Sequence, residues 1–122
     1  MTAKAMTIAV VEDNDLSRDL IVNTLLGLTG MDVHSYKNGQ TAWADLGNGH
    51  STDMLISDVN MPQMDGLTLL SNVKKKNPEK PCIIISGNPN YKNAAKDLGA
   101  DRFLAKPFTI TELLQAVQEF ST

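Results

Sequence analysis

The chain has 122 residues with a net charge of −3, and 42% of the residues are hydrophobic. This length and apolar content fit one compact domain over residues 1–122 and leave too little chain for a second. The acidic balance argues against a nucleic-acid surface, because the basic run at 74–76 is explained as the charged end of a helix before Asn77 and Pro78. No apolar run approaches the roughly 20 residues of a membrane span, and no secretory signal is visible, so the expected compartment is the cytoplasm.

Short apolar runs recur along the chain and end at polar, glycine or proline residues. They cover residues 8–11, 54–57, 82–85 and 103–105, and a further strand is expected near 31–36. Continuous valine- and isoleucine-rich runs are typical of strands buried on both faces of a parallel sheet. Cys82, the single cysteine, lies in one of them and is expected to be a small buried hydrophobe without a disulfide partner.

The segments between these runs have the periodicity of amphipathic helices. One apolar face is predicted to contain Leu16, Leu20, Ile21, Leu25 and Leu28. A second contains Ile110, Leu113, Leu114, Val117 and Phe120, and weaker stripes cover 40–46, 64–76 and 90–98. Thr109 and Glu112 have the spacing of a capping box that opens the last helix. Residues 47–50 are expected to form a turn before the third strand.

Strand and helix alternate five times along the sequence. Such alternation predicts an α/β fold, a doubly wound five-stranded parallel sheet with helices on both faces, right-handed crossovers and all strand ends on one rim. Polar residues expected to share that rim are Glu12, Asp13, Asp58, Ser86 and Lys106. With strand order 2-1-3-4-5, a crevice opens between the first and third strands, so the acids of both strands flank it.

Asp58 is the most informative residue, because it follows a buried apolar run and precedes a loop rich in proline and glycine. A carboxylate in this position is costly unless it takes part in chemistry, although an Asp after a strand can also cap a helix or form a turn. Carboxylates of Glu12 and Asp13 beside it would repel it, so a cation is required. Oxygen ligands without His or Cys suit Mg²⁺, and a plain salt-bridge network with Lys106 is the alternative.

A hydroxyl at Ser86, an ammonium at Lys106 and the small Gly87 would complete a pocket for a tetrahedral anion. Together with a carboxylate and a metal ion, they predict in-line transfer of a phosphoryl group onto Asp58. The metal and the lysine would neutralise charge on the equatorial oxygens.

Four motifs occur in the order in which a known family has them. They are Glu12-Asp13, the segment DVNMPQMDG from Asp58, Ser86-Gly87, and the segment GADRFLAKPF at 99–108. Over essentially its whole length the chain resembles the response-regulator receiver domains of bacterial two-component signalling, and single-domain chemotaxis regulators in particular. The resemblance implies a flavodoxin-like (βα)5 fold.

The resemblance also implies a role for each rim residue. Asp58 would be the phosphoacceptor, and Lys106 would contact the phosphoryl group. Mg²⁺ would be held by Asp13, Asp58 and the Asn60 carbonyl, with Glu12 acting largely through water.

A switch pair, Ser86 and Phe103, is implied in the same way, as is a cis peptide between Lys106 and Pro107. Phe103 stands where receivers frequently have tyrosine, so this switch has no phenol hydroxyl and would report by burying or exposing its ring. Asn60 and Asn88 would border the path of the water that hydrolyses the acyl phosphate.

The expected partners are a histidine kinase or histidine phosphotransfer protein as donor, and a downstream protein that binds the face of the fourth helix, fifth strand and fifth helix. No direct nucleic-acid partner is expected, and no enzyme activity beyond the chain's own phosphorylation and dephosphorylation. A stand-alone receiver is favoured, and a receiver from a hybrid histidine kinase or a longer regulator fits the same sequence.

Two enzyme-like or cofactor-binding alternatives fit less well. A phosphohydrolase of the haloacid-dehalogenase type would use a second acid two residues after the nucleophile, where this chain has Asn60. An FMN-binding flavodoxin would need a phosphate loop rich in hydroxyls and glycine after the first strand. The acidic segment at 12–15 would instead repel the FMN phosphate.

Overall fold

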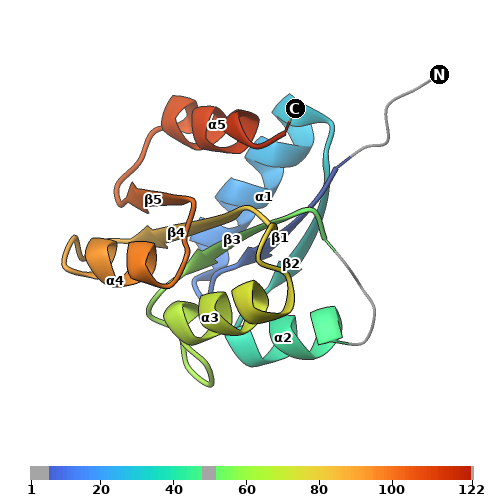
Figure 1. Ribbon diagram of the computed structural model, residues 1–122. Coiled ribbons are helices and arrows are strands. Elements are labelled where there is room, and N and C mark those ends of the chain that lie inside the picture. Colours follow the sequence, from blue (N-terminus) through green and yellow to red (C-terminus); the bar gives the residue numbers. More distant parts are fainter. Residues whose placement is uncertain (1–5, 48–51, 122) are drawn as a thin grey trace.

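The structure, a computed structural model, describes residues 6–47 and 52–121. Within them, strands and helices alternate (Figure 1). The elements are β1 (Thr7–Val11), α1 (Asp15–Thr29), β2 (Asp32–Tyr36), α2 (Gly39–Gly47), β3 (Met54–Asp58), α3 (Gly66–Lys76), β4 (Cys82–Ser86), α4 (Tyr91–Asp97), β5 (Arg102–Ala105) and α5 (Ile110–Glu119). Of the turn expected at 47–50, Gly47 ends α2 and the other positions lie outside the described residues.

The strands form one parallel sheet in the order β2-β1-β3-β4-β5, which confirms the predicted fold class and strand order. Helices α1 and α5 cover one face, and α2, α3 and α4 cover the other (Figure 1). β3 and β4 are buried along their whole length, because each lies between two other strands and under helices on both sides. The end of β3 is therefore fixed on every side except the rim.

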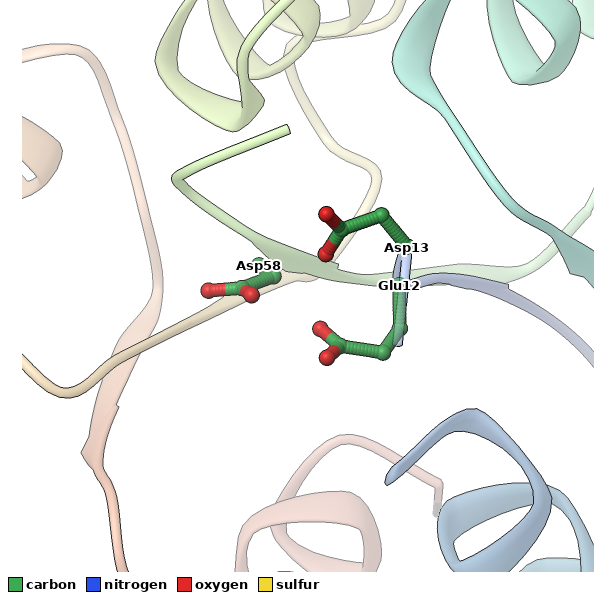
Figure 2. Close-up of side chains that lie close together, drawn as sticks. All are labelled: Glu12, Asp13 and Asp58. Atoms are coloured by element: carbon green, nitrogen blue, oxygen red, sulfur yellow. The ribbon is translucent and has the colours of Figure 1, made fainter. Parts of the chain in front are cut away.

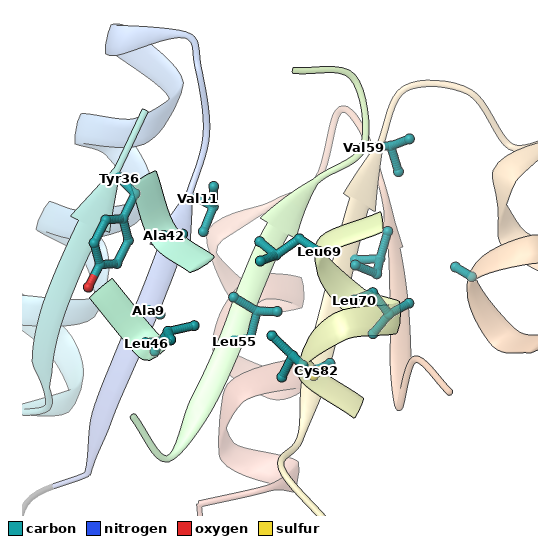
Figure 3. Close-up of a cluster of buried hydrophobic side chains, with 13 residues drawn as sticks. Ala9, Val11, Tyr36, Ala42, Leu46, Leu55, Val59, Leu69, Leu70 and Cys82 are labelled. Atoms are coloured by element: carbon teal, nitrogen blue, oxygen red, sulfur yellow. The ribbon is translucent and has the colours of Figure 1, made fainter. Parts of the chain in front are cut away.

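Alternate residues of each strand enter two separate hydrophobic clusters, as the pleat of a strand requires. In β1, Ala9 and Val11 pack toward α2 and α3, whereas Ile8 and Val10 pack toward α1 and α5. Figure 3 shows the first of these clusters, in which Cys82 is buried as a free cysteine, as predicted. The sheet thus has a core on each side, and the strand ends are its remaining open edge.

The two main predicted helical faces are wrong in part, and on the α5 face Ile110 is 49% exposed. In α1, Ile21 and Leu25 are buried, but Leu16, Leu20 and Leu28 are 82%, 56% and 61% exposed. Each helical residue is turned by about 100° from the one before it, which places Leu16 and Leu20 well to the side of the buried pair. Leu28 lies in the last turn of the helix. The apolar stripe is therefore wider than the contact that α1 makes with the sheet.

Side-chain caps fix the helices that begin just after the rim. The backbone N–H of Ser17 donates to Asn14 Oδ1 at 2.9 Å at the start of α1, and the N–H of Thr68 donates to Asp65 Oδ1 at 2.8 Å at the start of α3. The predicted capping box of Thr109 and Glu112 opens α5. These caps hold the loops that follow β1, β3 and β5.

The turn from β3 into α3 needs a glycine at position 66. An ideal Cβ on Gly66 would lie 1.9 Å from the backbone oxygen of Asp58, which is far inside van der Waals contact. The N–H of Gly66 donates to the Val59 carbonyl at 2.8 Å. The start of α3 is thus packed directly against the backbone of Asp58.

Among the helices of the described residues, none has both the length and the apolar character needed to cross a bilayer.

Candidate functional site

Three carboxylates meet at the rim of the sheet, at the ends of two neighbouring strands. Glu12 and Asp13 follow β1, and Asp58 is the last residue of β3, which pairs with β1. One oxygen of each carboxylate lies within 4.8 Å of the others, and Figure 2 shows Glu12 and Asp13 reaching toward Asp58. The structure therefore brings together the acids that the strand order predicts to share the crevice.

Lys106 reaches this cluster from the loop after β5. Its ammonium lies 3.1 Å from Asp58 Oδ2 and 3.3 Å from Glu12 Oε1. Its backbone N–H donates to the Ser86 carbonyl at 2.9 Å, which ties the loop to the end of β4. The peptide between Lys106 and Pro107 is cis, as predicted.

The charges at the rim do not balance. Glu12 and Asp58 are only 2% and 8% exposed, and Asp13 is exposed beside them. Burial raises the pKa of the Glu12 carboxyl to about 7, neighbouring Asp58 adds to the shift, and Lys106 opposes it. Burial alone would lower the pKa of Lys106, but the hydrogen bonds and charges of Asp58 and Glu12 raise it. One ammonium among three carboxylates leaves an excess of negative charge.

This cluster fits a hard divalent cation. Its ligand atoms are all oxygens, two acids are held by the sheet, and the exposed Asp13 leaves one side open to water and to a phosphoryl oxygen. Mg²⁺ prefers few protein ligands and retains waters, so the residues present suit it.

Asn60 lies in the loop after β3, and Ser86 is the last residue of the neighbouring strand β4. Asn60 is exposed, and its Oδ1 accepts a hydrogen bond from the Tyr91 hydroxyl at 3.4 Å. Ser86 is buried, and its Oγ accepts the backbone N–H of Asn88 at 3.0 Å. The Asp58 carboxylate itself accepts the N–H of Val59 at 2.8 Å through Oδ1. Oδ2 of Asp58 thus faces the lysine.

Phe103 lies on β5, away from the carboxylates. It is half-buried against the core cluster of α2, α3 and α4, and it is two residues before Ala105, the register partner of Ser86. Its ring lines a cavity of about 380 Å³ between α4 and β5. The structure places Ser86 and Phe103 on adjacent strands at different distances from the rim.

Sequence reasoning did not single out two residues that the structure joins to the site. Arg18 donates to the Glu12 carbonyl at 2.9 Å and pairs with Asp15, which holds the loop after β1. Tyr91 reaches Asn60 across 31 residues of chain. An arginine in the first turn of a helix and an aromatic residue at a helix start are too common to have indicated either contact.

A second cavity, of about 360 Å³, opens beside the cluster. It is lined by Ser17, Leu20, Ile21, Lys106, Pro107 and Phe108. Exposed Leu20 of α1 and the loop after β5 therefore form an apolar surface next to the rim.

The fold and the rim define a doubly wound α/β protein with an acidic pocket and a lysine at the carboxyl ends of its strands. A family model, the response regulator receiver domain, matches residues 8–118, and the chain belongs to this family. Receiver domains bind Mg²⁺ at an acidic pocket and interact with phosphodonor proteins and downstream targets. The clustered residues Glu12, Asp13 and Asp58 form an acidic pocket of this kind here.

Relatives include single-domain and multidomain proteins. The chain is 37% identical over 108 residues to the chemotaxis protein CheY1 of Helicobacter pylori, covering 85% of this chain and 87% of that protein. It is 33% identical over 107 residues to the transcriptional regulator NtrC of Rhizobium meliloti, covering 86% of this chain. It spans only 22 to 24% of the length of the NtrC proteins it matches.

Solved structures agree with this assignment. A response regulator from Chloroflexus aurantiacus matches with a TM-score of 0.89 at 30% identity, covering 96% of this chain and 98% of the other. The response regulator TrrA of Thermotoga maritima, solved in complex with Mg²⁺ and BeF, matches with a TM-score of 0.85 at 25% identity, covering 94% and 98%.

Proposed function

We propose that this chain takes a phosphoryl group from the phosphohistidine of a kinase or phosphotransfer protein onto Asp58, with Mg²⁺, and thereby changes its affinity for a downstream protein. The observation that carries the proposal is the convergence of a buried carboxylate, two further acids and the Lys106 ammonium at 3.1 Å. A cytoplasmic location stays a prediction that accompanies it.

The transfer uses the Asp58 oxygen that faces Lys106. The bond from phosphorus to the donor imidazole nitrogen breaks while a bond to the carboxylate oxygen forms, and the electron pair leaves with the imidazole. Lys106 neutralises charge on the phosphoryl oxygens, and the Ser86 hydroxyl turns to donate to one of them.

Asp13, Asp58 and the Asn60 carbonyl would hold Mg²⁺, with Glu12 acting through water, and the ion would supply further positive charge to the phosphoryl oxygens. We propose no reaction on other molecules, so the site promotes only the gain and loss of its own phosphoryl group. Asn60 supports this limit, since a phosphohydrolase of the haloacid-dehalogenase type would use an acid there.

The donor is proposed to dock on the N-terminal half of α1. Leu16 and Leu20 are exposed there. Leu20 lines the cavity of about 360 Å³ whose wall also includes Lys106 and Pro107. Large exposed leucines beside a reactive site are typical of a protein-binding surface. A donor helix that covers them would bring its phosphohistidine to the open side of Asp58.

Leu20→Asp should slow phosphotransfer from a phosphohistidine protein about tenfold or more and leave phosphorylation by acetyl phosphate unchanged. The charge disrupts an apolar contact that only the protein donor makes. Leu28→Asp is the matched control, because Leu28 is similarly exposed at the other end of α1. Both rates are followed by the mass of the intact protein. Failure of the wild type to accept from either donor would contradict the proposed function, and equal slowing by both variants would contradict the docking site.

The downstream partner is proposed to bind the face of α4, β5 and α5. The cavity beside Phe103 is also lined by Lys92, Lys96 and Arg102. Among the described residues Lys92 and Lys96 have no ion pair, whereas Asp101 in the same wall is paired with Lys74. This groove is therefore basic on an acidic protein, and it suits an acidic segment with an apolar side chain that contacts the phenyl ring.

Beryllofluoride, a phosphoryl mimic, should change the backbone chemical shifts of residues 88–98 and 101–108 as well as those near Asp58. Moving the Ser86 hydroxyl toward a phosphoryl oxygen leaves space for the ring of Phe103 and shifts a pre-existing equilibrium. The measurement is a pair of amide spectra with and without the mimic, and Asp58→Asn is the control that should show neither change. Shifts confined to the loops around Asp58 would contradict this route.

A further inference from the structure

Tyr91 connects the two loops that flank Asp58. It is the first residue of α4, and its hydroxyl donates to Asn60 Oδ1 in the loop after β3. Its backbone N–H donates to the Asn88 carbonyl at 3.2 Å, and the N–H of Asn88 donates to Ser86 Oγ at 3.0 Å. A single residue thus bonds to the β3–α3 loop through its side chain and to the β4–α4 loop through its backbone.

The ring of Tyr91 packs against the core, whereas the Asn60 side chain that it contacts is exposed. Tyr91 is half-buried and packs against the same core cluster as Phe103. Among the described residues, no other hydrogen bond holds the exposed Asn60 side chain. The phenol therefore restrains an amide that would otherwise sample several rotamers in water.

We propose that Tyr91 is a positioning residue for hydrolysis of the acyl phosphate, acting by orienting the Asn60 carboxamide toward the attacking water. The inference rests on the proposed function and deepens it. In the reaction the water oxygen bonds to phosphorus, and the bond from phosphorus to the Asp58 oxygen breaks. The carboxylate is regenerated, and both water protons leave with the product as dihydrogen phosphate.

The position of Tyr91 links the lifetime of the acyl phosphate to α4, which belongs to the proposed partner-binding face. Phe103 of β5 has no hydroxyl. On the face of α4 and β5, the phenol that reaches the rim is that of Tyr91 in α4. The second tyrosine of the chain, Tyr36, bonds instead to Asp45 of α2 and lies on β2 at the sheet edge. A displacement of the start of α4 would release Asn60 and prolong the phosphorylated state.

Tyr91→Phe should slow the loss of phosphate from Asp58 about twofold to fourfold, the lower part of the range for one neutral hydrogen bond, because the two oxygens are 3.4 Å apart. Protein is phosphorylated with acetyl phosphate and Mg²⁺, the donor is removed, and the remaining phosphoprotein is followed by intact mass. Tyr36→Phe is the matched control and should decay at the wild-type rate. An unchanged or faster decay of Tyr91→Phe would overturn the proposal.

Asn60→Ala separates positioning from a general structural effect. In that background Tyr91→Phe should cause no further slowing, because the group it orients is gone. The same slowing in both backgrounds would overturn the proposal.

A second readout needs no phosphorylation. The side-chain amide signals of Asn60 should shift in Tyr91→Phe and stay in place in Tyr36→Phe, and unshifted signals in Tyr91→Phe would also overturn the inference. Absence of any phosphorylation in the wild type would instead count against the proposed function.

Discussion

Asp58→Asn should fold as the wild type does and acquire no acyl phosphate from acetyl phosphate and Mg²⁺. The substitution keeps the shape of the side chain and removes the oxygen nucleophile, so the loss of phosphorylation should be complete. Lys106 keeps Glu12 as a partner at 3.3 Å, and one repulsive charge leaves the acidic cluster. Intact mass measures the phosphoryl group, and circular dichroism measures the fold.

Asp65→Asn is the matched control for this experiment. Asp65 is exposed and caps α3 through Oδ1, a role that asparagine also performs. This variant should gain the same mass as the wild type. An undiminished mass increase in Asp58→Asn would show that another residue accepts the phosphoryl group.

Removal of divalent metal should slow phosphorylation about a hundredfold or more. Two like charges about 4 Å apart repel by about 4 kcal/mol at an effective dielectric near 20, and the incoming phosphoryl anion meets three carboxylates with only one ammonium. The measurement compares initial rates in EDTA and in saturating Mg²⁺. Asp13→Ala should reproduce the effect of EDTA, because it removes a proposed metal ligand. The exposed Asp13 side chain contributes little to packing, so the fold should be unchanged.

The specificity of the metal effect can be tested at the start of α1. Asp15 is an exposed acid two residues further along, paired with Arg18 and outside the three-carboxylate cluster. Asp15→Ala should keep most of the Mg²⁺-dependent rate. Equal rates in EDTA and in Mg²⁺ would contradict a metal role.

The sequence predicted the fold and the place of the rim acids for a physical reason. Strands such as 54–57 and 82–85 are buried on both faces, so their runs are almost entirely apolar, and the polar residue that follows each run, Asp58 or Ser86, marks the rim. Parallel order then places these polar residues along one edge. The functional roles of Asp58, Asp13 and Lys106 stay predictions.

Periodicity was less informative for helix surfaces. It places apolar side chains on one face of α1, but it does not show how much of that face the sheet covers, and Leu16 and Leu20 remain exposed. The contact between Tyr91 and Asn60 could not be predicted either. It depends on how two loops approach each other in space, and neither residue type has a preferred partner.

Gly66 and Gly87, which follow β3 and β4, differ in how closely other atoms approach them. A Cβ at Gly66 would lie 1.9 Å from the Asp58 backbone oxygen, whereas a Cβ at Gly87 would meet its nearest neighbour, Lys106, at 3.9 Å. If Asp58 accepts a phosphoryl group as proposed, the end of β3 has no room to recede toward α3, while the loop after β4 has room to close. We therefore expect the response to the proposed phosphorylation to spread toward α4 and β5 rather than toward α3, so that surface changes on α1 and α4 could alter partner choice without changing the strand that carries Asp58.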